Sequence, residues 1–248
     1  MTDPGPDPMA DPAQGSPVRG TEGEDTAYDD TAYTAAVTDL LGVLAHGALM
    51  ASLRMAADAE LAPTLRLKSA LAGLAFGEYR QFDELTAHMR SRGIDPERAM
   101  QPFVVPFAAF HERTRPSDWL EGLVKAYVGE GIAKDFYREL AGVLDEDTLA
   151  VMTPVLDDRD EAAFIVPVVS GATAADPRLA GRLSLWGRRL MGEALSQAQR
   201  VAAERDSLAA LLAGGVDRPG LDLAALTRMF SRLTEGHANR METLGLSS

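Results

Sequence analysis

Apolar residues recur every three or four positions along several long segments of the chain, and this period most limits the possible folds. In residues 63–91, for example, Leu67, Leu71, Leu74 and Leu85 fall on one stripe. That spacing places side chains on one face of an α-helix, whereas a half-buried strand needs strict alternation. Aromatic residues make up only 6% of the 248 residues, and β-branched runs are short. The sequence therefore predicts an all-α protein with one sizeable core.

Prolines, glycines and capping residues divide the chain into six expected helices. These are residues 35–59, 63–91, 119–144, 147–169, 177–213 and 223–244. Asp118 and Asp176 are expected to cap the third and fifth helices, and Pro154 and Pro167 to kink or end the fourth, before a loop at Ser170 and Gly171. The connection over residues 101–118 holds three prolines, which exclude a continuous helix, and its apolar residues predict that it packs on the bundle.

The first 30 residues differ in composition from the rest. They hold eight acids, one base, five prolines and four glycines, and little that can be buried. We expect residues 1–30 to form a disordered acidic tail and residues 31–248 to form the helical domain. A tail that docks on a basic partner is the functional alternative.

Several classes of protein are disfavoured by what the sequence lacks. It has no cysteine, which removes disulfides, thiolate nucleophiles and cysteine metal sites. No apolar run of about 18 residues and no secretory leader is apparent, so we expect a cytoplasmic protein with no membrane segment. No glycine-rich phosphate loop or nucleophile elbow occurs either.

Polar residues interrupt the apolar stripes at the same height on several helices. Folding residues 35–91 back about Pro63 sets Ala48 opposite Glu78, and a second hairpin about Leu144 sets Glu130 opposite the fourth helix. Burying unpaired carboxylates is costly, so the residues of this layer should share a metal, a proton or a basic partner. The layer, which is the candidate metal site, consists of Glu78, Gln81, Glu130, Asp158 and Glu161.

Two segments, residues 111–140 (HERTRPSDWLEGLVKAYVGEGIAKDFYREL) and residues 185–237 (from LWGRRLMGEAL to SRLTEGH), carry a resemblance to a known family. Over residues 35–246 the chain resembles a bacterial family of ferritin-like proteins related to the di-iron hydroxylases of isopentenyl-modified adenosine in tRNA. The resemblance implies a ferritin-like four-helix bundle with two additional C-terminal helices. It also implies a di-iron site built from a Glu on one helix and Glu-x-x-His on the next, used twice.

The sequence departs from that ligand pattern at several positions. Ala48 stands where a Glu is expected, Gln81 and Glu161 stand where the two histidines are expected, and His46 is the only nearby substitute. Acids and an amide suit magnesium, manganese or calcium better than a redox pair of irons. Three interpretations stay open. The first is a degenerate polar layer without metal, in which Lys134 neutralises Glu130 and Gln81 bridges Glu78 to a backbone carbonyl. The second is a site with one or two bound divalent metals, with iron or manganese possible, and the third is a different helix register.

Two functions follow from these interpretations. One is a hydroxylase-like enzyme that acts on a modified tRNA base or a small hydrophobic substrate, and the other is a non-catalytic ferritin-like protein that serves in assembly or small-molecule binding. Arginines that could face tRNA are Arg178, Arg182, Arg188, Arg189, Arg200, Arg228, Arg232 and Arg240, but the net charge of −13 favours a solvated outer face for them.

The last two helices carry more apolar residues than a four-helix core requires. They predict either a homodimer through these helices or closure over the bundle within one chain. The residues are Leu185, Trp186, Leu190, Met191, Leu226, Met229, Phe230 and Leu233.

Overall fold

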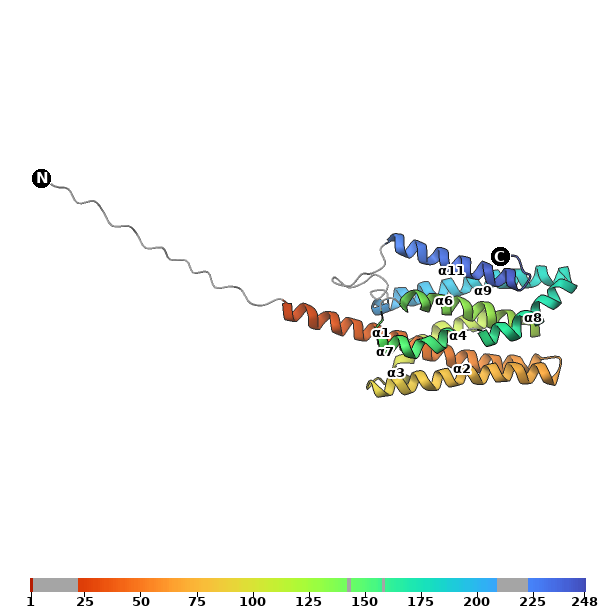
Figure 1. Cartoon of the computed structure of the whole chain (residues 1–248), viewed down its shortest axis with the longest axis horizontal. Helices are drawn as coiled ribbons and strands as arrows, with labels where there is room; N and C mark the ends of the chain where they lie inside the picture. The colour runs from red at the N-terminus through yellow and green to blue at the C-terminus, as the bar shows by residue number, and fades with distance from the viewer. Residues whose placement is uncertain (2–21, 142–143, 158, 209–222) are drawn as a thin grey trace.

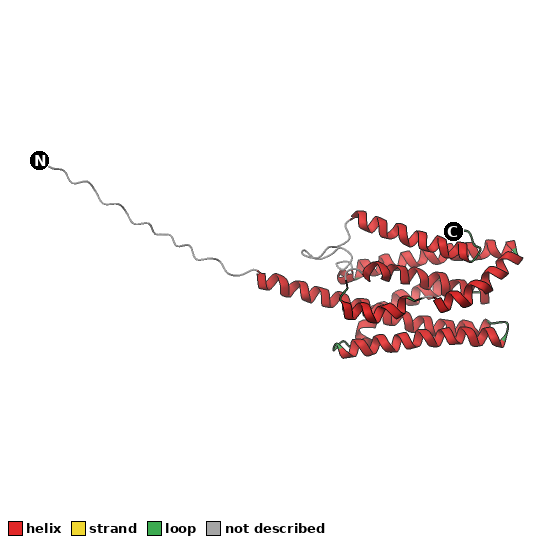
Figure 2. Cartoon of the chain, viewed as in Figure 1, coloured by secondary structure: helices red, strands yellow, loops and turns green. Residues whose placement is uncertain are grey.

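A computed structural model of the chain describes residue 1 and residues 22–141, 144–157, 159–208 and 223–248. Within these ranges every regular element is helical and no strand occurs, which confirms the all-α prediction (Figure 2).

The first two long helices form an antiparallel hairpin (Figure 1). α1 (Glu22–Asp58) ends in the short η1 (Ala59–Leu61), and α2 (Leu65–Ser91) follows. The Thr64 hydroxyl caps α2 by accepting a hydrogen bond from the Leu67 amide at 3.3 Å. The expected hairpin about Pro63 is therefore present. Its first helix begins at Glu22 rather than near Ala35, so residues 22–30 are helical, and the predicted tail otherwise lies outside the described residues.

α1 also corrects the expectation that no helix of membrane-spanning composition exists. Residues 31–61 are long and apolar enough to span a bilayer, but 61% of an apolar window of 18 residues within them is buried inside the bundle. Leu40, Leu41 and Leu44 are each at most 1% exposed. This burial is typical of the core helix of a helical bundle.

The proline-rich connection, for which no helix was predicted, is made of short helical segments. They are α3 (Pro96–Met100), η2 (Gln101–Phe103) and α4 (Val104–Arg113). Phe103 is fully buried, so the connection does pack on the bundle. Gly42 of α1 permits this approach, because a Cβ atom there would overlap the carbonyl of Ala99.

The third long helix contains a wider turn. α5 (Trp119–Val124) continues through the π-turn η3 (Lys125–Gly129) into α6 (Glu130–Leu140). Asp118 caps it as predicted, accepting from the Glu121 amide at 3.0 Å. In an unbroken α-helix, residues five apart point about 140° away from each other. A π-turn takes up one extra residue, so Lys125 and Glu130 both face the interior.

The expected fourth helix is divided into two. α7 (Glu146–Met152) and η5 (Thr153–Leu156), which contains Pro154, precede a break at Asp157, and α8 (Arg159–Ala175) follows. Pro167 lies inside α8 without ending it. The predicted loop at Ser170 and Gly171 is wrong, because α8 continues to Ala175 and stops where the Asp176 cap and Pro177 start the next helix.

The last two helices are α9 (Pro177–Glu204) and α11 (Leu223–Thr243). α9 ends earlier than predicted, at a point where Arg205 pairs with the buried Asp39 of α1. Trp186, Leu190, Met229 and Leu233 are all at most 8% exposed, so most of the apolar surplus of these helices closes over the bundle within one chain. Leu185 and Phe230 remain exposed.

Candidate carboxylate site

Three glutamates from three helices meet in the middle of the bundle. Glu78 of α2, Glu130 of α6 and Glu161 of α8 each offer an oxygen within 4.8 Å of the others. Glu78 and Glu161 are 5% exposed, and Glu130 Oε2 is cut off from solvent. We call these three residues the carboxylate cluster. The three glutamates lie at the same level along the bundle axis. This level is set by the hairpin about Pro63, the π-turn η3 and the start of α8 at Arg159.

A lysine supplies the positive charge of the carboxylate cluster. Lys134, one turn after Glu130, is 5% exposed, and its Nζ donates to Oε1 and Oε2 of Glu161, each at 3.1 Å. The same ammonium donates to the Asp157 carbonyl oxygen at 3.2 Å and lies 3.9 Å from Glu78 Oε1. These three hydrogen bonds use all three N–H donors of the Lys134 ammonium. Lys134 was expected to neutralise Glu130, whereas its closest contacts are with Glu161.

Proton uptake by buried carboxyl groups completes the charge balance of the carboxylate cluster. Burial raises the pKa of Glu78 to about 8, with repulsion from Glu161 and a hydrogen bond to it adding to the shift against the opposing effect of Lys134. Burial, with repulsion from Glu161 and Glu78, raises the pKa of Glu130 well above its usual value. Burial alone would lower the pKa of Lys134, but the three carboxylates raise it. At neutral pH the cluster therefore holds a charged Lys134 beside protonated carboxyl groups.

Of the two remaining predicted site residues, the structure describes Gln81 only. Gln81 Oε1 is buried without a hydrogen-bond partner among the described residues, so no bridge from Glu78 to a carbonyl is seen. Asp158 lies outside the described residues. Ala48 is buried in an apolar cluster, and His46 packs edge-on against Phe107 with ring centroids 5.0 Å apart, so it replaces no missing ligand.

A second buried polar group, not predicted from the sequence, lies between α1, α4 and η3. Lys125 Nζ donates to the Thr114 carbonyl at 2.7 Å and sits 5.5 Å from the ring centre of Phe110. Burial lowers the pKa of Lys125 to about 8, although Asp58 opposes that shift, and burial lowers the pKa of His111 to about 3. Lys125 falls within residues 121–128, all of which are buried, so no single apolar face of the helix marks its position in the sequence.

The residues of the carboxylate cluster do not fit a pair of irons. All donors are carboxylate oxygens, no imidazole joins them within the described residues, and the ammonium of Lys134 contacts the groups that would bind metal. Glu130 Oε2 is buried without a hydrogen-bond partner in the described part of the chain. In this structure the positive charge within the carboxylate cluster is the ammonium of Lys134.

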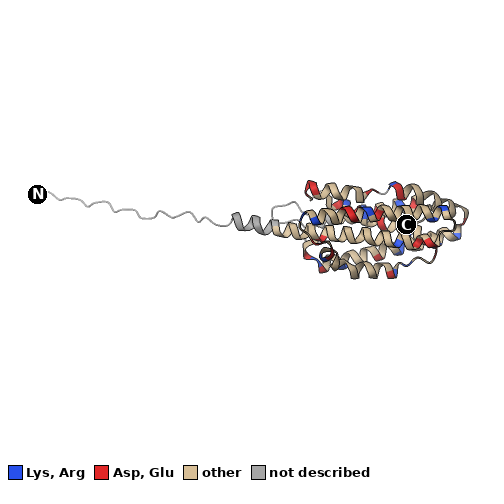
Figure 3. Cartoon of the chain, turned by 90° about the horizontal axis from the view of Figure 1, so that it is seen from below, with Lys and Arg blue, Asp and Glu red and all other residues tan. Residues whose placement is uncertain are grey.

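The arginine-rich surface is largely neutralised. Arg182 pairs with Asp118 and Glu121, Arg232 with Glu139, and Arg240 with Asp135 at 2.6 Å. In the view of Figure 3, basic and acidic residues alternate along the ribbons of the bundle. The arrangement agrees better with a solvated outer face than with a tRNA-binding surface.

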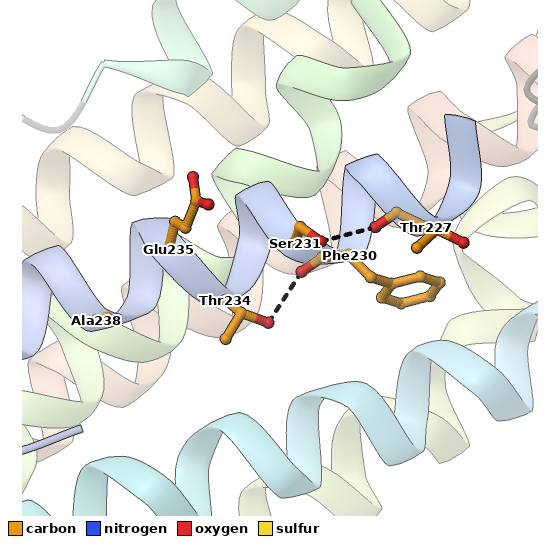
Figure 4. A pocket seen from close by; sticks show the side chains of 6 residues that line it. All are labelled: Thr227, Phe230, Ser231, Thr234, Glu235 and Ala238. Atoms are coloured by element: carbon orange, nitrogen blue, oxygen red, sulfur yellow. Dashed lines mark hydrogen bonds between the residues drawn. The ribbon is translucent and has the colours of Figure 1, made fainter. Parts of the chain in front are cut away.

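A shallow groove of about 590 Å³ follows one face of α11 (Figure 4). Phe230 lies along it, and the hydroxyls of Ser231 and Thr234 donate to the carbonyls of Thr227 and Phe230 at 3.1 and 2.9 Å. These hydroxyls are thus engaged within their own helix. The groove offers a largely apolar surface, and among its six lining residues Glu235 alone carries a group suited to catalysis.

Comparison with known proteins agrees with this architecture. No curated protein matches the chain. A family profile described as a ferritin-like domain of actinomycetes matches residues 31–215, which is well over half of the chain and includes all three helices that carry the carboxylate cluster. The chain therefore belongs to this family of ferritin-like proteins.

Proposed function

We propose that this protein is a ferritin-like domain that works without a di-iron centre, as a binding or assembly module rather than as an oxygenase. One observation carries the proposal: the Lys134 ammonium contacts Glu161 at 3.1 Å and Glu78 at 3.9 Å, in the middle of the carboxylate cluster. A buried cluster that already contains its own cation has little electrostatic need for a metal.

The site's chemistry supports the same proposal. Two-iron oxygen chemistry needs ligands that hold iron against competing ions, and imidazoles usually help to do this. By the resemblance to the tRNA hydroxylases, Gln81 and Glu161 stand where histidines are expected. The centre of the bundle instead holds three carboxyl groups and the buried Lys134, an arrangement that suits a role in fixing helix register.

The alternative is an active di-metal hydroxylase or oxidoreductase that acts on a modified tRNA base or a small hydrophobic substrate. Its support is the approach of three carboxylate oxygens to within 4.8 Å of one another in a ferritin-like bundle. In that case Lys134 would have to leave the cluster when metal binds, and iron or manganese would be the cofactor.

Metal analysis separates the two functions. The full chain, produced in cells grown with added iron and manganese, should carry far less than one metal per chain, and a chelator should leave its melting temperature unchanged. About one or two metals per chain, with a lower melting temperature after chelation, would support the hydroxylase instead.

We further propose that the assembly role uses α11, through a homodimer across the groove that contains Phe230, which is 43% exposed. Sedimentation of the wild-type protein should then show a dimer, and Phe230→Glu should shift it to monomer. A wild-type monomer at high concentration would contradict this proposal. A cytoplasmic location and an acidic tail before α1 stay predictions.

A further inference from the structure

We infer that the outer face of α2 binds a second copy of this chain, with the two α2 helices packed antiparallel about a two-fold axis near Ala75. This surface, which we call the α2 face, consists of the exposed residues Leu65, Arg66, Gly73, Phe76, Tyr79 and Glu84. α2 and α11 lie along opposite edges of the bundle in Figure 1. The inference therefore goes beyond the proposed α11 dimer, because it gives the chain a second contact with its own kind through different residues.

Large apolar side chains are exposed along the α2 face. Leu65, Phe76 and Tyr79 are 84%, 63% and 47% exposed, so no described part of the chain covers them. They follow one another over about 21 Å of the helix and lie within about 60° of one another around its axis. The opposite side of α2, with Leu71 and Leu85, is buried against the rest of the bundle. A continuous apolar stripe on a solvent-facing helix is typical of a surface that binds another protein.

Two glycines leave space beside this stripe. Gly73 and Gly77 lie in the interior of α2, where glycine is less favourable than alanine. A Cβ atom at either position would meet no other atom within 4 Å, so nothing in the described chain requires the side chain to be absent. A second helix could approach this side of α2 closely, and Phe76 of that helix would find room beside the two glycines.

The charges select a second copy of this chain as the partner. Arg66 and Glu84 are 18 residues apart, which is about five turns, so they project from the same side of α2. Ala75 lies midway between them. In an antiparallel pair about a two-fold axis at Ala75, Arg66 of each copy lies level with Glu84 of the other, whereas a parallel pair in register opposes like charges. Neither side chain has an ion pair with any other described residue.

The two ion pairs set the direction and register of the helices more than they add affinity, because exposed pairs are weak. The α2 face also mixes apolar and charged side chains, whereas the α11 groove is largely apolar. We therefore expect the α2 contact to be the weaker of the two. It should join α11 dimers into tetramers as the protein concentration rises, and leave the dimer as the main species in dilute solution.

Cross-linking tests the predicted register directly. The chain has no cysteine, so a single engineered thiol reports on one position. We would make Arg66→Cys and Glu84→Cys in the full chain, treat each protein alone and an equimolar mixture with a short bis-maleimide at high concentration, and separate the products on a denaturing gel. The mixture should give about ten-fold more covalent dimer than either protein alone, because residue 66 lies opposite residue 84 and about 27 Å from its own copy.

A matched pair of variants tests the role of the apolar stripe. Phe76→Glu, added to both cysteine proteins, should abolish the excess of covalent dimer in the mixture. Leu185→Glu changes an equally exposed apolar residue, on α9, and should leave that excess unchanged. Both positions face solvent, so circular dichroism should show the same helix content as for the parent proteins. Cross-linking that survives Phe76→Glu would overturn the inference.

The remaining outcomes separate this inference from the proposed α11 dimer. Equal cross-linking in the mixture and in each protein alone would overturn the antiparallel register, and no cross-linking in the mixture would overturn the α2 contact; both results would leave the α11 dimer standing. With Phe230→Glu added to both proteins, the excess in the mixture should persist, and its loss would overturn the independence of the α2 face. A wild-type protein that stays monomeric in dilute solution while the mixture cross-links would overturn the α11 dimer alone.

Discussion

Replacing Glu78 with glutamine should stabilise the protein at neutral pH. In the fold, burial and the neighbouring carboxylates raise the pKa of Glu78 from 4.5 to about 8, so its carboxyl group must take up a proton to be buried at pH 7. Glutamine has the same shape as the protonated acid, and it can both donate a hydrogen bond to Glu161 and accept one from Lys134. The variant therefore keeps the contacts and removes the cost of protonation.

The size of the effect follows from proton linkage. A raised pKa in the fold gives stability that is fully present below pH 4.5 and is lost as the pH rises through about 8. The loss is about 1.4 kcal/mol per pH unit over this window. At pH 7 it amounts to about 3 kcal/mol, which for a chain of this length corresponds to a rise in melting temperature of about 6–12 °C for Glu78→Gln.

Chemical unfolding followed by circular dichroism at pH 5, 7 and 8.5 measures this difference. The gain from Glu78→Gln should grow with pH, from about 0.7 kcal/mol at pH 5 to about 3 kcal/mol at pH 7. Glu84→Gln, at an exposed position on the same helix, is the control and should change the free energy of unfolding by less than about 0.5 kcal/mol. A Glu78→Gln protein that is less stable than wild type at pH 7 would show that Glu78 is ionised, as a metal ligand or a partner of Lys134, and would refute the reasoning.

Two further changes test the packing around the cluster and the start of the domain. Gly131→Ala should lower the free energy of unfolding by about 1–3 kcal/mol, because a Cβ atom there would collide with Arg240 and disturb its two hydrogen bonds to Asp135. Unfolding by denaturant measures this loss of stability, and an unchanged midpoint of unfolding would contradict the prediction. Deleting residues 2–21 should leave the melting temperature nearly unchanged, because their composition offers little apolar surface to bury, and a drop of several degrees by calorimetry would show that this segment docks.

The periodicity of apolar residues predicted the long helices, but it predicted neither the helices within residues 96–113 nor the start of α1 at Glu22. Glu78, Glu130 and Glu161 could be placed at one height because antiparallel hairpins pair residues equidistant from their turns. The break before α8 agrees with the signal of Pro154. The persistence of α8 past Ser170 could not be predicted, because it depends on tertiary packing that outweighs the local glycine signal. The partner of Lys134 also required three dimensions, since spacing along one helix favours Glu130 but the folded chain brings Glu161 closer.

The fate of Gln81 shows a second limit of sequence reasoning. A polar residue on a buried stripe can be predicted to lie inside the bundle, and Gln81 Oε1 is indeed buried, but its partner cannot be read from its spacing. Asp58 and Lys125 were missed for the converse reason. Each belongs to a stretch that reads as ordinary amphipathic helix, but the helix is buried on all sides at residues 121–128, which encloses Lys125 near the charge of Asp58.

The five-residue turn η3 holds one residue more than an ordinary helical turn, so the helix keeps its rotational phase on either side of it. Deleting a single residue from within this turn would therefore let the helix close as ordinary α while Glu130 and Lys134 kept facing the interior. The same deletion between Glu130 and Lys134, where the helix is ordinary α, would rotate the remainder of α6 by about 100° and carry Lys134 away from the carboxylate cluster. A change of chain length is thus expected to be tolerated at η3 and not between the two charged residues that follow it.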